Sequence, residues 1–195
     1  MIAAAFALAL TLTGGDPEAR VVIETSRGDV TLRLDAGRAP ATTCNFLKYV
    51  TSDAYSGGAF FRTVVRETND NPNPISVVQA ATPAGSDDPG LGPIALERTR
   101  DTGLRHVAGT ISMARDGPDT ATSSFFIVVE DAPALDFGGG RNPDGQGFAA
   151  FGMVVEGMDV VREIHAGSAV DEALFEPVSI MRVSLTGDMP AVCAA

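Results

Sequence analysis

Few of the residue types on which common enzyme mechanisms depend occur in this sequence. Only two histidines and two cysteines are found among 195 residues, and they show no metal-ligand spacing. Neither a Gly-x-Ser-x-Gly motif nor a His-Glu-x-x-His motif is present, and neither His106 nor His165 has an evident nucleophile to serve. We therefore expect no metal site, no cofactor and no standard hydrolytic triad.

Basic residues are also scarce. Lys and Arg number 14 against 25 Asp and Glu, which gives a formal net charge of −11. The arginines are scattered among acidic residues, and a surface of this charge repels phosphate backbones, so we expect no nucleic-acid partner. The hydrophobic fraction of 45% is that of an ordinary globular domain, and the length favours one domain rather than two.

No apolar run is long enough to span a bilayer. The stretch Ile2–Thr13 has 12 residues, against the ~20 that a membrane-spanning helix needs, but it matches the hydrophobic region of a secretory signal. No Lys or Arg precedes it, and a buried first helix or strand is the alternative. We expect a signal peptide or leader over residues 1–19, a periplasmic or secreted protein, and no stable membrane insertion after the leader is removed.

The two cysteines allow two interpretations. Cys44 lies in an expected helix, where a lone cysteine is often a small buried apolar residue. In an oxidising compartment Cys44 and Cys193 could instead pair and fasten a C-terminal tail over residues 188–195. The sequence does not give their distance, so the pairing stays open.

Hydrophobic periodicity predicts the first elements. Residues Val21–Thr25 and Val30–Leu34 alternate at period two around a turn, which indicates a β-hairpin with one buried face. Pro40 followed by apolar residues at helical spacing predicts an amphipathic helix that ends near Val50. A second helix is expected over Met158–His165, between two glycines.

The rest of the chain is typical of short strands broken by Gly, Pro, Asn and Asp. This pattern, with only two helices, predicts a mainly β protein with a closed or nearly closed antiparallel barrel. The further strands are expected at Ala59–Val65, Ile75–Ala80, Gly109–Ala114, Ser124–Val129, Ala149–Val155 and Val178–Leu185.

Two loops invite a ligand interpretation that their sequences do not support. Arg66–Pro74 is rich in Asn, Asp and Pro but lacks the central glycine and closing Glu of an EF-hand, so turn chemistry is the better interpretation. Phe137–Gly147 contains three consecutive glycines but no Lys-Ser/Thr pair, and we interpret it as a flexible loop rather than a phosphate cradle.

The most informative residues are the run Phe60-Phe61-Arg62 and the segment Gly109–Ile127, which contains Ser112-Met113-Ala114 and Ser123-Ser124-Phe125-Phe126-Ile127. Together they resemble the cyclophilin family of peptidyl-prolyl cis-trans isomerases. The similarity continues through Phe151–Val154 and Gly157–Val160 and covers nearly all of residues 21–185. It implies a closed antiparallel eight-stranded cyclophilin-like barrel capped by two α-helices, over residues 20–187.

The resemblance implies a chemistry that needs no nucleophile. Rotation about an X–Pro bond crosses a barrier of ~18–20 kcal/mol, because the nitrogen lone pair is delocalised into the carbonyl, and takes tens to hundreds of seconds unaided. A catalyst has only to hold the proline ring in an apolar pocket and donate a hydrogen bond to the twisted nitrogen. A guanidinium is suited to this because it is permanently charged and only donates. Stabilisation specific to the twisted state lowers the barrier.

Family roles can be carried over position by position. Arg62 takes the place of the catalytic arginine, although alone it would more often be a surface ion pair, and Phe126 that of the floor of the proline pocket. Arg115 is either a contact to the substrate backbone or a solvated charge. The residues that the resemblance assigns to substrate binding are Phe61, Val77, Gln79, Met113, Ala114, Arg115, Ser124, Phe126, Leu135 and Phe148.

The sequence departs from the family pattern in the pocket. Ser76 stands where a second phenylalanine is usual, with Ile75 or Val77 as possible substitutes because the alignment is uncertain there. Ser124 replaces a glutamine, Ala134 a Trp or Phe, and Phe148 a His or Tyr. Gln79 follows Arg62 by 17 positions, about twice the usual separation.

Three functions remain open at this point. The first is an isomerase that acts on X–Pro bonds of proline-containing polypeptides. The second is a proline-peptide binding module or chaperone with weak or no isomerase activity, which the pocket departures favour. The third is a scaffold that uses the loop Arg66–Pro74. In each case we expect a monomer.

Overall fold

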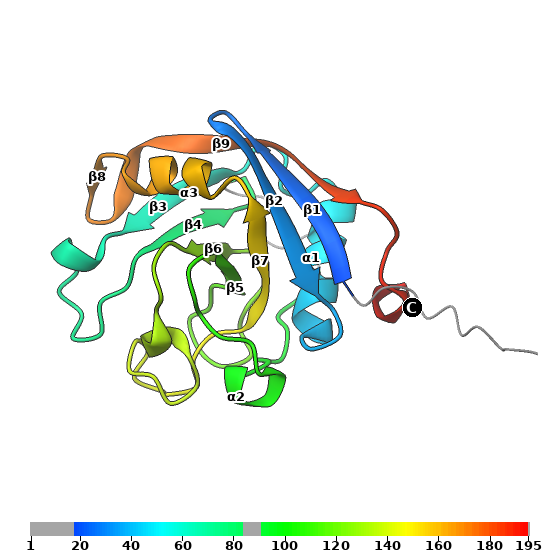
Figure 1. Cartoon of the computed structure of the whole chain (residues 1–195), viewed down its shortest axis with the longest axis horizontal. Helices are drawn as coiled ribbons and strands as arrows, with labels where there is room; N and C mark the ends of the chain where they lie inside the picture. The colour runs from blue at the N-terminus through cyan, green and yellow to red at the C-terminus, as the bar shows by residue number, and fades with distance from the viewer. Residues whose placement is uncertain (1–17, 84–90, 195) are drawn as a thin grey trace, which may run out of the picture.

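The computed structural model describes residues 18–83 and 91–194, in which a β-barrel is the central element (Figure 1). The expected leader lies almost wholly outside the described residues, and Glu18 and Ala19 already belong to the first strand. The strands are β1 Glu18–Thr25, β2 Gly28–Asp35, β3 Ala59–Val64, β4 Val77–Ala81, β5 Thr110–Met113, β6 Phe125–Val128, β7 Ala150–Glu156, β8 Ala169–Val170 and β9 Ala173–Thr186. The α-helices are α1 Pro40–Thr51, α2 Thr99–Thr102 and α3 Met158–His165, and short 3-10 helices lie at Arg66–Thr68, Pro133–Leu135 and Ala191–Cys193.

Eight of the strands close into a barrel. They follow the order β1-β2-β7-β5-β6-β4-β3-β9, and β9 pairs back onto β1, with every pairing antiparallel. The two-residue strand β8 pairs only with β9 and lies outside the closed ring. The expected eight-stranded antiparallel barrel is confirmed.

The barrel interior is filled by the inward-facing residue of each strand and by one face of α1. Phe46 on α1 contacts the rings of Tyr55, Phe125 and Phe151, with centroids 5.3–5.5 Å apart. Helices α1 and α3, both predicted from periodicity, lie on different sides of the barrel (Figure 1). The one-turn helix α2 was not predicted, because four residues show no periodicity.

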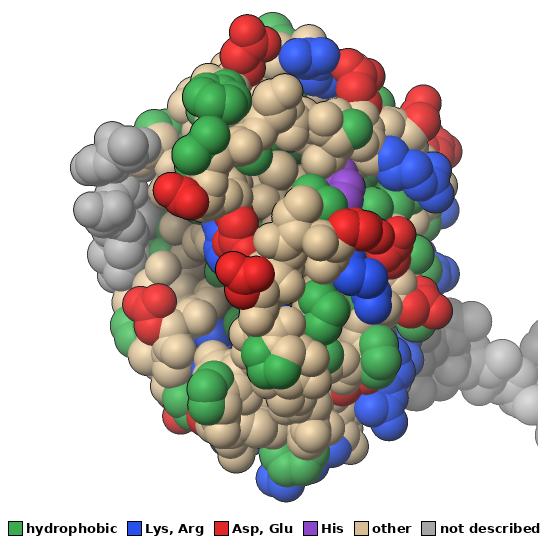
Figure 2. Space-filling model, turned by 90° about the vertical axis from the view of Figure 1, so that its left-hand side faces the viewer, with side chains coloured by type: hydrophobic (Ala, Val, Ile, Leu, Met, Phe, Trp, Pro, Cys, Tyr) green, Lys and Arg blue, Asp and Glu red, His purple; other side chains and the backbone are tan. Residues whose placement is uncertain are grey.

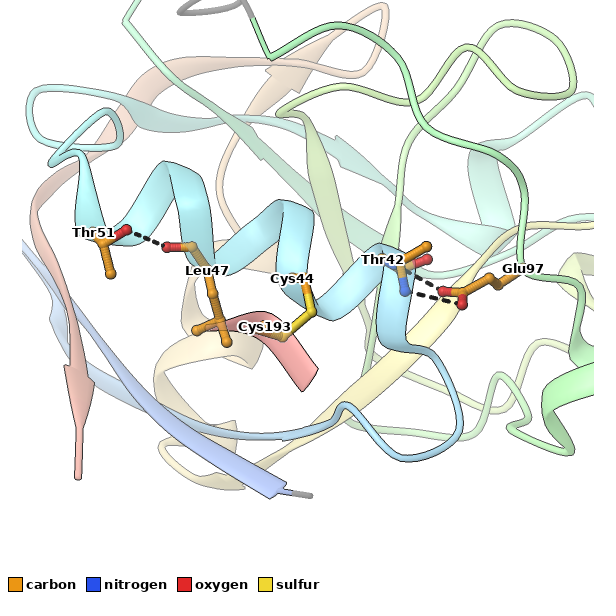
Figure 3. The surroundings of a disulfide bond; sticks show 7 residues. Thr42, Cys44, Leu47, Thr51, Glu97 and Cys193 are labelled. Carbon is orange, nitrogen blue, oxygen red and sulfur yellow. Dashed lines mark hydrogen bonds between the residues drawn. A yellow bond between two sulfur atoms is a disulfide. The ribbon is translucent and has the colours of Figure 1, made fainter. Parts of the chain in front are cut away.

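Helix α1 is held at its N-terminus by a residue far away in sequence. No side chain next to the helix caps it, but the carboxylate of Glu97 accepts hydrogen bonds from the backbone N–H groups of Ala41 and Thr42, at 3.0 and 2.8 Å. Figure 3 shows this carboxylate at the first turn. Free N–H groups and the helix dipole make a helix N-terminus a favourable place for an anion.

Cys44 and Cys193 form a disulfide that joins α1 to the C-terminal 3-10 helix (Figure 3). Their Cα atoms are 5.0 Å apart, and 149 positions separate them in sequence. The bond settles the alternative left open by the sequence, and it fastens the C-terminal tail to the barrel.

Strand β9 is longer than the sequence predicted. It was expected over Val178–Leu185, but it begins at Ala173 and ends at Thr186, and so includes Pro177, which has no N–H for a ladder. Pro177 is tolerated because the pairing of β3 with β9 is interrupted there: Phe60 lies opposite Val178, whereas Arg62 lies opposite Ala173. The extra residues form a hairpin with β8 that the sequence did not reveal.

The outer surface carries charges of both signs. On the face shown in Figure 2, acidic and basic side chains are interspersed around polar and apolar ones. Among the described residues, no helix has both the length and the apolar character needed to cross a membrane.

Candidate active site

A cavity of about 370 Å³ opens on the outside of the barrel, over strands β3, β4 and β6. Its walls come from these strands, from the segment that follows β5, and from the loop Phe137–Gly147. The lining residues are Arg62, Val64, Ile75, Val77, Gln79, Ala114, Arg115, Asp116, Thr120, Thr122, Ser124, Phe126, Leu135, Arg141, Asn142 and Phe148. Nine of the eleven residues predicted for the site are among them.

Arg62 is the cation at one side of this cavity. It lies on β3 opposite Gln79 on β4, and its Nη1 donates a 2.8 Å hydrogen bond to Gln79 Oε1. Its Nε and Nη2 both donate to Glu172 Oε2, the Nε bond at 2.9 Å. Hydrogen bonds thus hold the guanidinium on two sides. The side chain is 38% exposed, so it is still accessible to solvent.

The Gln79 amide is oriented by its two neighbours. Arginine only donates, so the atom facing Arg62 is the amide oxygen. Its Nε2 then donates to Ser124 Oγ at 3.0 Å, and this hydroxyl donates to the Ala80 carbonyl at 3.1 Å. Ser124, a departure from the family glutamine, thus completes a hydrogen-bonded chain that begins at Arg62.

The floor of the cavity is apolar. Phe126 on β6 is 5% exposed and meets Phe148 edge to face, with ring centroids 5.6 Å apart. Leu135, Val77 and Ile75 complete an apolar cluster around it, separate from the barrel core. A small ring such as that of proline is the type of group that this floor can bury.

A buried polar group supports Phe126 from behind. The His106 imidazole stacks on the Phe126 ring, with Nδ1 2.8 Å from Asp136 Oδ1 and Nε2 2.9 Å from Ser112 Oγ. Burial lowers the pKa of His106 against the opposing effect of Asp136. Burial alone would raise the pKa of Asp136, but hydrogen bonds from His106 and Arg105 outweigh it and lower that pKa. The pair is therefore a neutral imidazole beside a carboxylate at neutral pH.

The sequence showed no evident nucleophile for His106, but the structure places the Ser112 hydroxyl 2.9 Å from its Nε2. Ser112, His106 and Asp136 are connected as in a hydrolytic triad. However, Ser112 is 0% and His106 is 1% exposed, and neither lines the cavity. A substrate cannot reach the hydroxyl, so the group is a support for the pocket floor.

Arg115 is neither a solvated charge nor a free donor for substrate. Its side chain is 1% exposed, it forms a bidentate pair with Asp144 at 2.7 and 2.9 Å, and its Nε and Nη2 donate to the Gly147 carbonyl. The hydrogen bonds from Arg115 lower the pKa of Asp144. The guanidinium also lies over the Phe148 ring, 4.8 Å from its centroid. Four of its five N–H groups are used to hold a cavity wall in place.

Two residues predicted to contact substrate do not line the cavity. Met113 is buried in the barrel core because it pairs with Phe125, whose side chain faces inward, whereas the next residue, Ala114, faces the cavity. Phe61 lies at the bulge between Phe60 and Arg62 and is 38% exposed outside the cavity.

Of the residues left open at the position of the second pocket phenylalanine, Ser76 does not line the cavity. Its side chain is buried, and its hydroxyl lies 3.1 Å from Glu130 Oε2. Alternation along this segment brings Ile75, Val77 and Gln79 to the cavity instead. At the position where the family usually has a second phenylalanine, this pocket has the aliphatic side chains of Ile75 and Val77. Ala134 packs on the edge of the apolar cluster but does not line the cavity.

The sequence analysis missed the cavity-lining residue Arg141 and, behind it, Glu172 and Asn69, which form a hydrogen-bonded group with Arg62. It also missed the lining residues Val64, Asp116, Thr120, Thr122 and Asn142. Asn69 Nδ2 donates to Glu172 Oε1 at 2.6 Å, and Asn69 Oδ1 accepts a 2.6 Å hydrogen bond from Arg141. Burial lowers the pKa of Arg141, with Glu172 opposing this and Arg62 adding to it. No local motif marks these residues, because they come from three loops that are far apart in sequence.

The loop Arg66–Pro74 shows the turn chemistry that its composition predicted. Asn69 Oδ1 accepts from the Asn71 N–H and Asn71 Oδ1 from the Asn73 N–H, which are side-chain turns two residues long. No cluster of three or more metal-ligating side chains occurs in the described part of the chain.

Fold and site together define a class: an antiparallel barrel with an external groove, in which a fixed cation lies beside an apolar floor and no His or Cys lines the wall. Its lining combines apolar side chains with hydrogen-bonding groups of Arg62, Gln79 and Ser124.

Comparison with known proteins agrees with this class. Residues 20–185 match the family described as cyclophilin type peptidyl-prolyl cis-trans isomerase/CLD. Peptidyl-prolyl cis-trans isomerase A of Dickeya dadantii is 36% identical over 170 residues, which cover 84% of this chain and 83% of that protein. The isomerase cyp18 of Streptomyces antibioticus is 39% identical over 147 residues, 74% of this chain and 81% of that protein.

Solved structures show the same fold. A cyclophilin-type isomerase of Cryptosporidium parvum superposes with a TM-score of 0.69 at 20% identity, covering 88% of this chain and 99% of that one. The chain belongs to the cyclophilin family of peptidyl-prolyl cis-trans isomerases, and prolyl isomerisation is the function that its family membership supports.

Proposed function

We propose that the cavity accelerates rotation about X–Pro bonds in polypeptides, with Arg62 stabilising the twisted amide. The proline ring lies on Phe126, and the polypeptide backbone runs past Gln79 and Ala114. Rotation removes the delocalisation of the nitrogen lone pair, so the nitrogen becomes an acceptor that it is not in the planar state. A guanidinium N–H directed at that nitrogen stabilises the twisted state alone, which lowers the barrier.

The observation that carries this proposal is the position of Arg62 at the edge of an apolar floor, with Gln79 fixing one of its nitrogens at 2.8 Å. A guanidinium that is already oriented loses little further conformational freedom when the substrate reaches the twisted state.

The test is the cis/trans exchange rate of a short Ala-Pro peptide, measured by NMR exchange for three proteins. Wild type is expected to accelerate the exchange, and Arg62→Ala to lose most of the acceleration. Arg66→Ala is a matched control: Arg66 is also 38% exposed and ion-paired, with Glu130, but it lies outside the cavity lining. Equal activity of Arg62→Ala and wild type would disprove the mechanism.

A binding module with weak isomerase activity is the second candidate. The observation in its favour is the aliphatic pair Ile75 and Val77 in the pocket, together with the small Ala134 beside it. Each gives less apolar contact to a proline ring than an aromatic side chain would. Peptide binding by wild type, by calorimetry, without any acceleration of exchange would favour this function over the first.

The partners that this proposal implies are proline-containing polypeptides in extended form. One of the similar solved structures, at a TM-score of 0.68, is a Cryptosporidium isomerase in the presence of the dipeptide Ala-Pro. We propose the same class of ligand for this chain, and the exchange and calorimetric measurements above use it.

We further propose that the protein works in an oxidising compartment, as a periplasmic or secreted protein. The bond between Cys44 and Cys193 supports this, because structural disulfides persist in such compartments and are rare in reducing ones. The test is mass spectrometry after alkylation of the protein taken from its own cells, with fractionation. Full alkylation of both cysteines without prior reduction would contradict the proposal.

A further inference from the structure

We propose that Glu172 is a positioning residue for Arg62. The turn between β8 and β9 places its carboxylate against the guanidinium. The proposal rests on the proposed function, in which Arg62 acts on the twisted amide. Glu172 and Arg62 are 110 positions apart in sequence and form an ion pair in which two guanidinium nitrogens donate to one carboxylate oxygen.

The turn that carries Glu172 has an unfavourable backbone. Val170 pairs with Ala173, so Asp171 and Glu172 form a two-residue turn, and both have positive φ, +49° and +67°. Such turns usually contain Asn-Gly or Asp-Gly, so Asp171 is an ordinary first residue, whereas Glu172 occupies the second position, where glycine is usual because a Cβ is disfavoured at positive φ. Backbone strain of this kind is often found at functional sites. A long acidic side chain at a position suited to glycine therefore points to a role for the carboxylate.

The backbone fixes the turn relative to the catalytic strand. The Thr63 N–H donates a 2.9 Å hydrogen bond to the Glu172 carbonyl, and Arg62 lies opposite Ala173 in the ladder. The backbone positions that carry the Glu172 carboxylate and the Arg62 guanidinium are therefore neighbours, joined by the hydrogen bonds of one strand pairing. This allows Glu172 to set the direction of the guanidinium rather than only to neutralise it.

The number of hydrogen bonds that Arg62 makes agrees with a guanidinium that is oriented by Glu172 but still able to donate to a substrate. Arginine has five N–H groups, of which Glu172 accepts two and Gln79 accepts one. Two N–H groups remain for a substrate. Glu172 and Gln79 hold different nitrogens, so together they restrict rotation of the guanidinium plane while leaving donors available.

The second oxygen of Glu172 is also held. Asn69, in the loop Arg66–Pro74, donates to Glu172 Oε1, and its own oxygen accepts from Arg141, which lines the cavity. The long Asn/Asp/Pro-rich loop therefore reaches the active site through Asn69 and fixes the carboxylate that fixes Arg62. This gives the insertion between Arg62 and Gln79 a role in the same reaction.

The experiment measures kcat and KM separately for wild type and four variants on one Ala-Pro peptide substrate. Glu172→Ala is expected to lower kcat about tenfold while KM changes less than about twofold, since a mispositioned group affects the transition state more than binding. Glu172→Gln keeps the shape and one acceptor oxygen, and should recover part of the loss.

Two controls separate the carboxylate from its surroundings. Asp171→Gly relaxes the neighbouring turn position and leaves Glu172 in place, so kcat should stay within about twofold of wild type. Glu176→Ala removes the same charge from the same hairpin at a side chain that is 88% exposed and does not contact Arg62. It should also leave kcat unchanged. Urea unfolding of each variant shows that it is folded.

The outcomes distinguish this inference from the proposed function. If wild type accelerates exchange and Arg62→Ala does not, the proposed function stands. Glu172→Ala with wild-type kcat would then overturn the positioning role. A higher kcat in Glu172→Ala would overturn it as well, because the carboxylate would be restraining Arg62. Absence of acceleration in wild type would instead contradict the proposed function itself.

Discussion

The imidazole of His106 lies parallel to the ring of Phe126, with centroids 6.1 Å apart and planes inclined by 17°. Phe126, which lines the cavity, is thereby supported by a buried polar side chain. Because His106 also holds Asp136 and Ser112, the position of the pocket floor depends on a hydrogen-bonded group that can titrate.

This arrangement predicts a loss of stability in mild acid. The pKa of His106 is lowered by burial, so below the ordinary value of about 6.5 the unfolded chain binds a proton that the folded protein resists. Stability is then fully present above that pH and falls as the pH decreases toward the lower pKa, by at most about 1.4 kcal/mol per pH unit for one proton. Urea unfolding of wild type and His106→Gln at pH 7.5, 6.5 and 5.5 measures this.

The variant should be less stable at pH 7.5 but should lose less stability on going to pH 5.5. Asp136 changes stability in the same direction but in a lower range, because its own pKa is lowered and its contribution is lost only as the pH falls below about 3.8. Parallel pH curves for the two proteins would contradict the assignment to His106.

The cap of α1 gives a prediction at a site remote from the cavity. Glu97 satisfies two N–H groups of the first helical turn and places a negative charge at the positive end of the helix dipole. Glu97→Ala should lower the free energy of unfolding by about 1–2 kcal/mol, as loss of a helix cap does, and Glu97→Gln by less. Chemical denaturation monitored by circular dichroism measures both, and peptide exchange activity at 25 °C should be retained. Equal stability of all three proteins would show that the cap is redundant.

Some elements and site residues of this protein could be predicted from the sequence, and others could not. The hairpin, α1 and α3 follow from periodicity, and Arg62, Gln79 and Phe126 follow from motif resemblance. Glu172 could not be found in this way, because its importance comes from a side-chain contact with Arg62, 110 positions away in sequence. The choice among Ile75, Ser76 and Val77 could not be made from the sequence, because the long segment before them makes the alignment uncertain and a shift by one residue moves a strand side chain to the other face.

The disulfide gives a prediction on stability. Breaking it frees a loop that contains most of the chain, since 149 positions separate Cys44 from Cys193. A Cys44→Ser, Cys193→Ser double variant should lose about 2–4 kcal/mol of unfolding free energy, because the unfolded chain gains conformational freedom. Urea unfolding of the variant and of oxidised and reduced wild type measures this. Reduced wild type should resemble the variant, and a difference between them would point to an effect of the substitutions themselves.

The register of the segment before β4 predicts opposite effects for two neighbouring substitutions. Val77 faces the cavity beside Phe126, so Val77→Phe should enlarge the apolar floor and tighten binding of a proline peptide, by up to about 1 kcal/mol. Ser76 is buried and turned to Glu130, so Ser76→Phe should overpack that region and cost about 1–3 kcal/mol of stability without improving binding. Calorimetric titration and urea unfolding of both variants test this. Tighter binding by Ser76→Phe and not by Val77→Phe would mean that the strand is shifted by one residue, and that the pocket is built from the other face of this segment.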